Sequence, residues 1–346
     1  MRAVLFCNLP YAFSILKPLQ DELSKRGFDS LWYVPSELIS LFPYGNFPTT
    51  SDIKEIEAFQ SDMIFVPGND LPWYLSGVKV QIFHGLAGEK KGHFRIRGFF
   101  DLYLTQGPYF TDRFQSLAQK HKNFSVVETG WCKLDALYIH DKKIEEKKEK
   151  LLTQSGAKKI ILYAPTFSPS LTSAVKLFDE IITLSKKEDY LVVIKFHDKM
   201  DKEIQKLYSD KQNQKLMILN DGDITEALKL SDVMVSDTSS VVYEFLFLDK
   251  PVITLASNSE NILWEDIKNP NDLVQKIDNS FNNMDDFKAK RGKIIELYHP
   301  FSDGKSATRM VDAVLEYIEK FGVPKKRKIS LLRKYKMIQK YGLWRW

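Results

Sequence analysis

The chain has 346 residues, of which 44% are hydrophobic, 27% charged and 13% aromatic. This composition is typical of globular proteins and excludes fibrous and disordered chains, and the length favours two domains. Cys7 and Cys132, the two cysteines, are too few for a disulfide scaffold or a cysteine-ligated zinc site, so we interpret them as small apolar residues in a reducing compartment. The start lacks a signal-peptide pattern and no apolar run approaches about 18 residues, so we expect a protein that is neither exported nor membrane-spanning.

The net charge of +5 is concentrated at one end of the chain. Nine basic residues and no acidic residue lie between 325 and 346. Without these nine, the 50 Lys and Arg residues fall to 41, against 45 Asp and Glu residues. The remainder of the chain is therefore mildly acidic, which argues against a general nucleic-acid-binding surface outside the tail.

In the first part of the chain, short β-branched and aromatic runs alternate with helical patterns, which is typical of parallel sheets covered by helices. We expect a buried strand at 2–8, followed by a helix at 14–26 that ends at Gly27. The later runs predict five more strands, at 31–34, 63–66, 78–83, 102–105 and 125–128. These elements predict one doubly wound domain.

The highly charged segment 138–158 predicts a solvated helix and a linker. A second series of strands follows, at 160–165, 190–197, 216–219, 232–237 and 251–255, with helices between them that include 239–248 and 306–321. The fold class is therefore α/β, with two Rossmann-like domains at 1–150 and 151–323 and a basic tail at 324–346. Such sheets bind ligands beyond the carboxyl ends of their strands, so we expect a cleft between the two domains.

Small hydroxyl residues follow the predicted strand at 232–237. Thr238, Ser239 and Ser240 precede an apolar helical run. Hydroxyl donors and uncovered N–H groups at a helix start favour an anion, so this stretch predicts a phosphate site. The alternative is that Asp237 or Thr238 only caps the helix. Glu244 lies further along this helix, where its carboxylate would accept hydrogen bonds from ribose hydroxyls.

Two histidines directly follow predicted strands. His84 precedes Gly85, and a neutral imidazole at that place is suited to act as a general base, although a structural role is the alternative. His197 occupies the equivalent position in the second half, two residues after Lys195, and this pair would donate to phosphate oxygens. No HExxH or similar spacing occurs, so we predict no metal site.

The segment 300–318 combines a glycine turn with a helix start. Ser306 is suited to cap the helix, and Lys305 and Arg309 lie near its positive end. Two cations beside exposed N–H groups predict a second phosphate-binding element, and the alternative is a capped surface helix with solvated charges.

Five short motifs then occur in a characteristic order: HG at 84–85, ILYAPTF at 161–167, IKFH at 194–197, VSDTSSVVYEF at 235–245 and DGKSATR at 303–309. In this order they resemble the CDP-glycerol glycerophosphotransferases, the teichoic acid primase and polymerase family. The resemblance implies a GT-B fold and transfer of glycerol phosphate from CDP-glycerol to an acceptor hydroxyl, with CMP as the leaving group and without a metal or cofactor. His84 then matches the base, His197 the second essential histidine, residues 238–240 the pyrophosphate-binding stretch, and Glu244 an acidic position of the pattern.

The chain departs from the family pattern in two places. After HG it reads LAGEKKGHF where the family usually has TPLKK, and Phe167 stands where a tryptophan often follows the threonine. The first departure concerns the acceptor side, for which a lipid-linked saccharide is the expected class.

Three alternative functions stay open at this point. A GT-B glycosyltransferase for capsule or lipopolysaccharide would use a nucleotide sugar, and a related phosphotransferase would use CDP-ribitol. A nucleic-acid-binding protein would use the basic tail, but the acidic remainder and the lack of a nucleic-acid-binding signature argue against it.

The tail itself has an amphipathic pattern. Leu331, Tyr335 and Ile338 are spaced to form one stripe of a helix. Four basic residues would lie largely off this stripe, and two tryptophans suited to the headgroup boundary follow them: Arg333, Lys334, Lys336 and Lys340, then Trp344 and Trp346. We expect the tail to dock a cytoplasmic, peripheral enzyme on the anionic inner face of the cell membrane, with a disordered or nucleic-acid-binding tail as the alternative.

Overall fold

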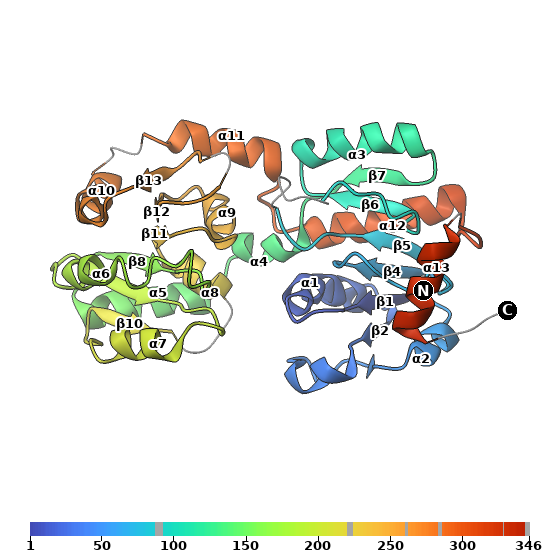
Figure 1. Ribbon diagram of the computed structural model, residues 1–346, viewed down its shortest axis with the longest axis horizontal. Coiled ribbons are helices and arrows are strands. Elements are labelled where there is room, and N and C mark those ends of the chain that lie inside the picture. Colours follow the sequence, from blue (N-terminus) through green and yellow to red (C-terminus); the bar gives the residue numbers. More distant parts are fainter. Residues whose placement is uncertain (87–92, 220–223, 260–261, 283–285, 328, 343–346) are drawn as a thin grey trace. The chain divides into compact units, whose positions relative to one another are not determined.

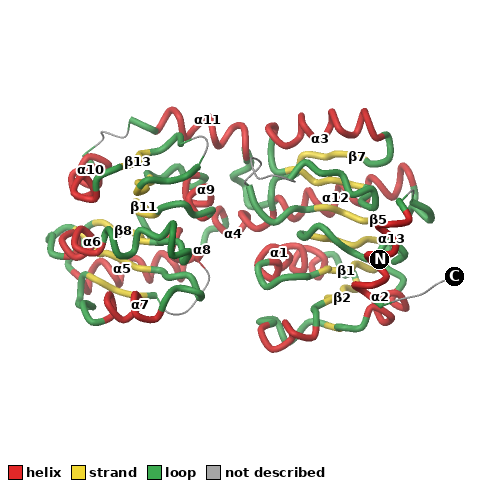
Figure 2. The backbone as a smooth tube through the Cα atoms, viewed as in Figure 1, coloured by secondary structure: helices red, strands yellow, loops and turns green. Residues whose placement is uncertain are grey.

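The computed structural model describes residues 1–86, 93–219, 224–259, 262–282, 286–327 and 329–342. It divides into two compact units (Figure 1). The first unit comprises residues 1–136 and 297–346, and the second comprises residues 137–296. In both units a parallel sheet is flanked by helices, as Figure 2 shows. Each unit therefore has the doubly wound α/β architecture that the alternation of strands and helices predicts.

The first unit contains a seven-stranded sheet in the order β3-β2-β1-β4-β5-β6-β7, with every pair parallel. The strands are β1 (Arg2–Phe6), β2 (Asp29–Tyr33), β3 (Thr49–Thr50), β4 (Met63–Val66), β5 (Val78–Gln81), β6 (Leu102–Thr105) and β7 (Ser125–Glu128). The helices are α1 (Ala12–Lys25), α2 (Ile53–Phe59), α3 (Pro108–His121), α12 (Ser306–Phe321) and α13 (Leu331–Tyr341). The central strands β4, β5 and β6 are buried throughout. This explains the mainly apolar sequences of β4 and β6, whereas β5 also buries Lys79 and Gln81.

The second unit contains a six-stranded parallel sheet in the order β10-β9-β8-β11-β12-β13. Its strands are β8 (Lys159–Tyr163), β9 (Tyr190–Ile194), β10 (Leu216–Ile218), β11 (Val233–Ser236), β12 (Val252–Leu255) and β13 (Glu265–Ile267). Its helices are α5 (Lys142–Ser155), α6 (Phe178–Ser185), α7 (Lys202–Ser209), α8 (Ile224–Leu230), α9 (Val241–Leu246) and α10 (Leu273–Phe281). Two further helices, α4 (Asp135–Tyr138) and α11 (Lys288–Tyr298), run across the unit boundaries.

The structure confirms the predicted strands and the helices at 14–26, 239–248 and 306–321, apart from shifts at their ends. The edge strands β3 and β13 were not predicted, because two or three residues are too short to show an alternating pattern. The charged segment 138–158 forms α5 as expected, but it is part of the second unit and not a linker. Lys148 on α5 pairs with Asp232 at 2.6 Å, and Leu151 is buried.

The observed division of the chain differs from the expected domains at 1–150, 151–323 and 324–346, because the chain returns to its first unit after residue 296. Asp135 explains part of this return. Its carboxylate accepts hydrogen bonds from the backbone N–H groups of Ser306 and Ala307, at 2.9 and 2.7 Å. The start of α12 is thereby held on the first unit, and Met310 and Val314 are completely buried there.

A buried ion pair holds the tail on the same unit. Arg327 and Asp101 are 7% and 6% exposed in their side chains, and a guanidinium nitrogen lies 2.5 Å from the carboxylate. The neighbouring Lys79 is completely buried, and its ammonium group donates to the carbonyl of Leu75 at 2.6 Å. Burial lowers the pKa of Lys79, and the positive charge of Arg327 lowers it further. The residues before α13 are therefore anchored in the fold.

The interpretation of the two cysteines as small apolar residues is confirmed. Cys7 and Cys132 are both free and completely buried. Burial raises the pKa of Cys7 to about 12, so this thiol stays protonated and behaves as a small apolar side chain.

Candidate active site

Each sheet reverses its strand order once, between β1 and β4 in the first unit and between β8 and β11 in the second. Ligands of open α/β sheets bind beyond the carboxyl ends of the strands at such a reversal. His84 follows β5, which pairs with β4. His197 follows β9, which pairs with β8, and residues 238–240 follow β11. The predicted strand-end residues thus lie at the ligand-binding edge of their own unit.

His84 is held in one tautomer by the loop after β4. Its Nδ1 lies 3.1 Å from the carbonyl oxygen of Pro67. Because a carbonyl oxygen only accepts hydrogen bonds, Nδ1 is the donor, and in the neutral ring Nε2 is then the nitrogen with the free lone pair. The ring of Tyr11 stacks on the imidazole with a centroid distance of 5.2 Å, and His84 remains exposed. In the neutral tautomer this geometry leaves Nε2 free to accept a proton.

Gln81 fixes the loop that orients His84, and the sequence reasoning missed it. Its side chain is 2% exposed, and its amide nitrogen lies 3.1, 3.2 and 2.9 Å from the carbonyl oxygens of Val66, Pro67 and Gly68. A polar residue within the predicted strand at 78–83 was the available signal. Phe83, directly before His84, has a φ of 62°, which is unfavourable for an aromatic residue and marks a tightly determined turn.

His197 is held in the opposite tautomer. The backbone N–H of Lys199 donates to its Nδ1 at 3.1 Å, so a neutral ring carries its proton on Nε2. Partial burial lowers the pKa of His197, which favours that neutral form at pH 7. The ring of Phe167 lies 4.4 Å from the imidazole, between centroids. His197 is therefore arranged as an N–H donor, and Lys195 lies immediately beyond the end of β9.

Asp237 connects the two loops at the strand reversal of the second unit. Its side chain is 1% exposed and accepts hydrogen bonds from the backbone N–H groups of Thr166 and Ser173, at 2.9 and 2.8 Å. The hydroxyl of Ser173 donates to the same carboxylate at 2.8 Å. Asp237 is thus not the cap of α9, and the motifs ILYAPTF and VSDTSS are joined through its carboxylate.

The hydroxyl residues after Asp237 differ in their partners. The hydroxyl oxygen of Thr238 accepts from the backbone N–H of Asn258 at 3.0 Å, so it supports the loop after β12. Within the described ranges of the chain, the hydroxyls of Ser239 and Ser240 bond to no other residue, and Ser240 is exposed. These two hydroxyls are available to a ligand. Glu244 is only 7% exposed within α9, which does not favour its predicted contact with a ribose.

The start of α12 does not have the geometry of the predicted phosphate site. Its first N–H groups already donate to Asp135. Arg309 donates to the carbonyl of Thr129 at 2.8 Å, pairs with Asp303 at 2.7 Å and lies over the ring of Phe301. Arg309 thus has a structural environment in the first unit, outside the expected donor domain. Lys305 is exposed, and its role stays a prediction.

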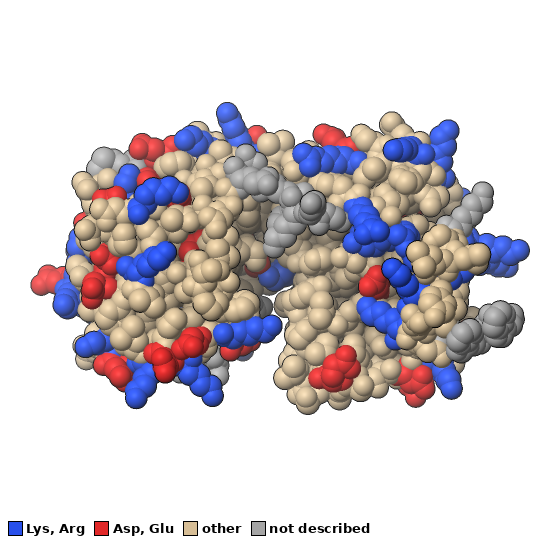
Figure 3. Space-filling view, viewed as in Figure 1, with Lys and Arg blue, Asp and Glu red and all other residues tan. Residues whose placement is uncertain are grey.

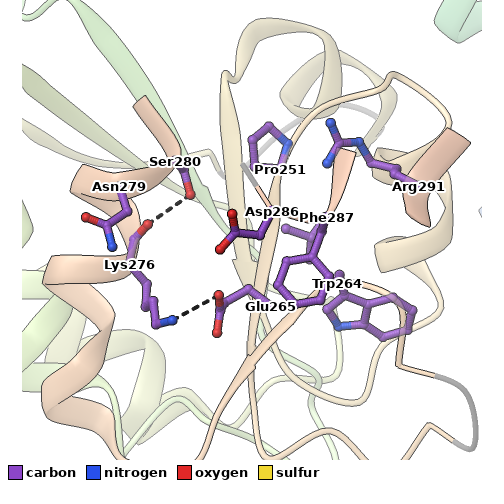
Figure 4. Close-up of a pocket in the computed structure, with 10 residues that line it drawn as sticks. Pro251, Trp264, Glu265, Lys276, Asn279, Ser280, Asp286, Phe287 and Arg291 are labelled. Atoms are coloured by element: carbon purple, nitrogen blue, oxygen red, sulfur yellow. Dashed lines mark hydrogen bonds and ion pairs between the residues drawn. The ribbon is translucent and has the colours of Figure 1, made fainter. Parts of the chain in front are cut away.

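A pocket of about 130 Å³ in the second unit lies away from this edge (Figure 4). It is lined by residues at the amino ends of β12 and β13, including Pro251 and Glu265, whereas Asp237 follows the carboxyl end of β11. Lys276 pairs with Glu265 at 3.1 Å, as the dashed line in Figure 4 shows, and Arg291 pairs with Asp249 at 2.9 Å. Because these charges have partners, the pocket does not extend the candidate site.

No three His, Cys, Asp or Glu residues among the described residues gather in a way that would hold a metal ion. No helix in the same part of the chain is both long and apolar enough to cross a membrane.

The tail forms the amphipathic helix α13, as predicted. Leu331 and Tyr335 are 82% and 54% exposed, whereas Met337 is buried. Three of the four predicted membrane cations, Arg333, Lys336 and Lys340, line a groove of the first unit, and the ammonium group of Lys334 lies over Trp73. The other two predicted membrane residues, Trp344 and Trp346, lie outside the described residues.

Comparison with known proteins gives a family match and several relatives. The protein-family model of the CDP-glycerol:poly(glycerophosphate) glycerophosphotransferases matches residues 89–316 of this chain. The matched range includes His197 and residues 238–240, and it begins just after His84. Teichoic acid ribitol-phosphate polymerase TarL of Staphylococcus aureus (strain NCTC 8325 / PS 47) is 25% identical over 265 residues, which cover 69% of this chain and 46% of the relative. Teichoic acid poly(glycerol phosphate) polymerase of Bacillus spizizenii (strain ATCC 23059 / NRRL B-14472 / W23) is 22% identical, with 69% of this chain and 68% of the relative covered. The chain spans about half the length of the first of these relatives.

Solved structures share the fold at low sequence identity. The wall teichoic acid polymerase TagF, in its H548A form, has a TM-score of 0.64 and 16% identity, with 92% of this chain and 89% of that chain covered. The S. aureus MnaA–UDP complex has a TM-score of 0.65 and 14% identity, with 92% and 97% covered. The likeness confirms the predicted GT-B-like α/β fold.

Proposed function

Because the chain belongs to the CDP-glycerol:poly(glycerophosphate) glycerophosphotransferase family, we propose that it transfers glycerol phosphate from CDP-glycerol to an acceptor hydroxyl in the synthesis of a cell-wall polymer. The acceptor is a lipid-linked saccharide or a growing polymer, and CMP is released. The observation that carries this proposal is the opposite hydrogen bonding of two strand-end histidines. Nδ1 of His84 donates to the carbonyl of Pro67, whereas Nδ1 of His197 accepts from the N–H of Lys199.

His84 is the base in this proposal. The acceptor hydroxyl attacks the β-phosphorus of CDP-glycerol and gives its proton to Nε2 of His84. A new P–O bond forms to the acceptor while the bond between the β-phosphorus and the oxygen of CMP breaks. The hydrogen bond from Nδ1 to Pro67 stabilises the imidazolium that results, because the negative oxygen end of the carbonyl dipole faces the positive ring.

Donors of the second unit stabilise the phosphoryl group that is transferred. Negative charge on the leaving and equatorial oxygens is best stabilised by donors that are already in place. The Nε2–H of His197, the ammonium group of Lys195 and the hydroxyls of Ser239 and Ser240 are such donors. Asp237 does not contact the phosphate in this proposal. It fixes the loops that carry these groups.

CDP-ribitol is the second candidate donor, since a relative with 25% identity over 265 residues is named a ribitol-phosphate polymerase. An assay with three labelled donors distinguishes the candidate functions. CDP-glycerol, CDP-ribitol and a UDP-sugar are each incubated with a panel of lipid-linked saccharides. We expect CMP and a product heavier by one glycerol phosphate with CDP-glycerol. Product from the UDP-sugar, with neither CDP-polyol consumed, would contradict the proposed function.

We also propose that one stripe of α13, formed by the exposed Leu331 and Tyr335 and the half-buried Ile338, docks the enzyme on an anionic membrane. Each inserted apolar side chain contributes about 1.5–3 kcal/mol and each basic residue near the surface about 1 kcal/mol, which together suffice for reversible binding. The double variant Leu331→Ser/Tyr335→Ser should therefore co-sediment less with phosphatidylglycerol vesicles than the unchanged protein. The exposed control variant Ile39→Ser should bind normally, and equal binding of all three proteins would exclude the stripe as the docking surface.

A further inference from the structure

The first unit contains a groove of about 580 Å³ that the mechanism above does not use. One wall is α13, and the other consists of residues 69–70 and 95–99. Five basic side chains line it: Arg95, Arg97, Arg333, Lys336 and Lys340. Phe99 and Met337 supply buried apolar surface. We call this feature the basic groove, and its volume is in the range of small-ligand sites.

The positive charge of the basic groove is largely uncompensated. Asp70 is the one carboxylate among the described residues that line it, and it pairs with Lys340 at 3.2 Å. Arg97 is half-buried, and burial lowers its pKa, with smaller contributions from the positive charges of Arg95 and Arg333. Figure 3 shows basic side chains gathered around α13 on this face of the first unit. Cations held this close to one another favour the binding of an anion with several charges.

The chemistry of the lining favours an anion that carries several charged groups. Three of the five cations are arginines, whose planar guanidinium groups bind two oxygens of a phosphate or a carboxylate at once. A phosphodiester chain or a diphosphate presents successive anionic groups, and these match cations that are spread along both walls of the groove.

One loop connects the groove with the base of the proposed reaction. Asn69 and Asp70 line it, and they continue the loop whose Pro67 carbonyl orients His84. Asn8, which follows β1, donates to the carbonyl of Asp70 at 2.9 Å and ties the loop to the strand reversal. The acceptor hydroxyl must reach His84, so an anionic group elsewhere on the same acceptor would lie along this loop.

We propose that the basic groove binds the phosphate groups of the acceptor, either the phosphodiesters of a polyol-phosphate chain or the diphosphate of a lipid carrier. This inference rests on the proposed function, because it takes the acceptor to be the substrate that His84 deprotonates. The groove places α13 in substrate recognition, which is separate from the membrane role of its outer stripe.

The two faces of α13 keep these roles apart. At about 100° per residue, Leu331, Tyr335 and Ile338 lie on one side of the helix. Arg333, Lys336 and Lys340 lie on the opposite side, together with the buried Met337. The membrane and the acceptor would therefore contact different residues of α13.

Charge reversal at two exposed groove residues tests the proposal. The variant Arg95→Glu/Lys336→Glu should bind a fluorescent synthetic glycerol-phosphate hexamer at least tenfold more weakly than the unchanged protein, measured by anisotropy without donor at 150 mM salt. The affinity of the unchanged protein should also fall steeply as salt increases, since it depends on several ion pairs. A diphosphate-linked lipid analogue in detergent, run in parallel, distinguishes the two sources of phosphate.

The matched control is Lys54→Glu/Lys120→Glu, which changes the net charge equally at exposed positions on α2 and α3. We expect it to bind both probes within twofold of the unchanged protein. Equal weakening in both variants, or unchanged binding of both probes by the groove variant, would overturn the inference. The inference would also be overturned if the groove variant no longer bound phosphatidylglycerol vesicles but still bound both probes fully. The groove would then be a site for lipid headgroups. These binding measurements need no turnover, so they test the groove alone. An error in the proposed reaction would appear in the transfer assay instead.

Discussion

Replacement of His84 by alanine should lower the rate of transfer by roughly 10²- to 10⁴-fold, which is the usual contribution of a general base. The affinity for CDP-glycerol should stay within about twofold, because the proposed donor groups are carried by the second unit. His84 is exposed and contributes little buried surface, so the fold should not change. Release of CMP under saturating donor and acceptor measures the rate, and calorimetric titration measures the donor affinity.

His121→Ala is the matched control for this substitution. It removes an exposed histidine at the end of α3 in the same unit, and we expect an unchanged rate. A His84→Ala enzyme that turns over within threefold of the unchanged protein would rule out the role of base. A loss of donor affinity equal to the loss of rate would instead indicate that His84 contacts the donor.

Local sequence patterns were sufficient to predict most of the fold. The strands β4 and β11 are buried over their whole length, so each appears in the sequence as an apolar run that is bounded by polar residues. Because side chains that follow such a strand lie at the ligand-binding edge, His84 and His197 were also predictable as candidates. The strand positions and the edge of the sheet thus follow from patterns within a few residues.

Contacts between distant segments could not be predicted in the same way. The carboxylate of Asp135 caps a helix that begins at Ser306, and Arg327 pairs with Asp101. These contacts assign α12 and α13 to the first unit, whereas sequence order alone predicted a second domain that continues to residue 323. Nothing in the local pattern around residues 300–330 carries this information, because the partners lie more than a hundred residues away.

The roles of two residues of the candidate site could not be predicted from the sequence for the same reason. The sequence marked residues 237–240 as a phosphate-binding stretch or a helix cap, and the fold gives the first of these residues a different role. Asp237 joins the loops after β8 and β11, and its partner Thr166 lies 71 residues away in the chain. Gln81 was overlooked because its role depends on the three carbonyl oxygens that accept from its side chain, and the sequence does not show that they lie close to it.

The network around Asp237 should be the most sensitive structural element of the second unit. Its carboxylate is almost completely buried, and two backbone N–H groups and one hydroxyl donate to it. Removal of a buried acceptor costs about 1–3 kcal/mol for each donor that is left unsatisfied. The loop at 164–173 would lose its connection to β11, and this loop carries Phe167, which packs against His197.

We therefore expect Asp237→Ala to destabilise the second unit by about 3 kcal/mol or more, summed over these donors, and to weaken CDP-glycerol binding at least tenfold. Hydrogen exchange followed by mass spectrometry should show faster exchange at residues 164–173, while exchange in β4 and β5 of the first unit stays unchanged. Asp210→Ala, at an exposed position after α7, is the control and should affect neither exchange nor binding. If Asp237→Ala abolishes donor binding while residues 164–173 remain fully protected, the carboxylate contacts the ligand directly. Unchanged exchange together with unchanged affinity would show that the two loops are held by other contacts.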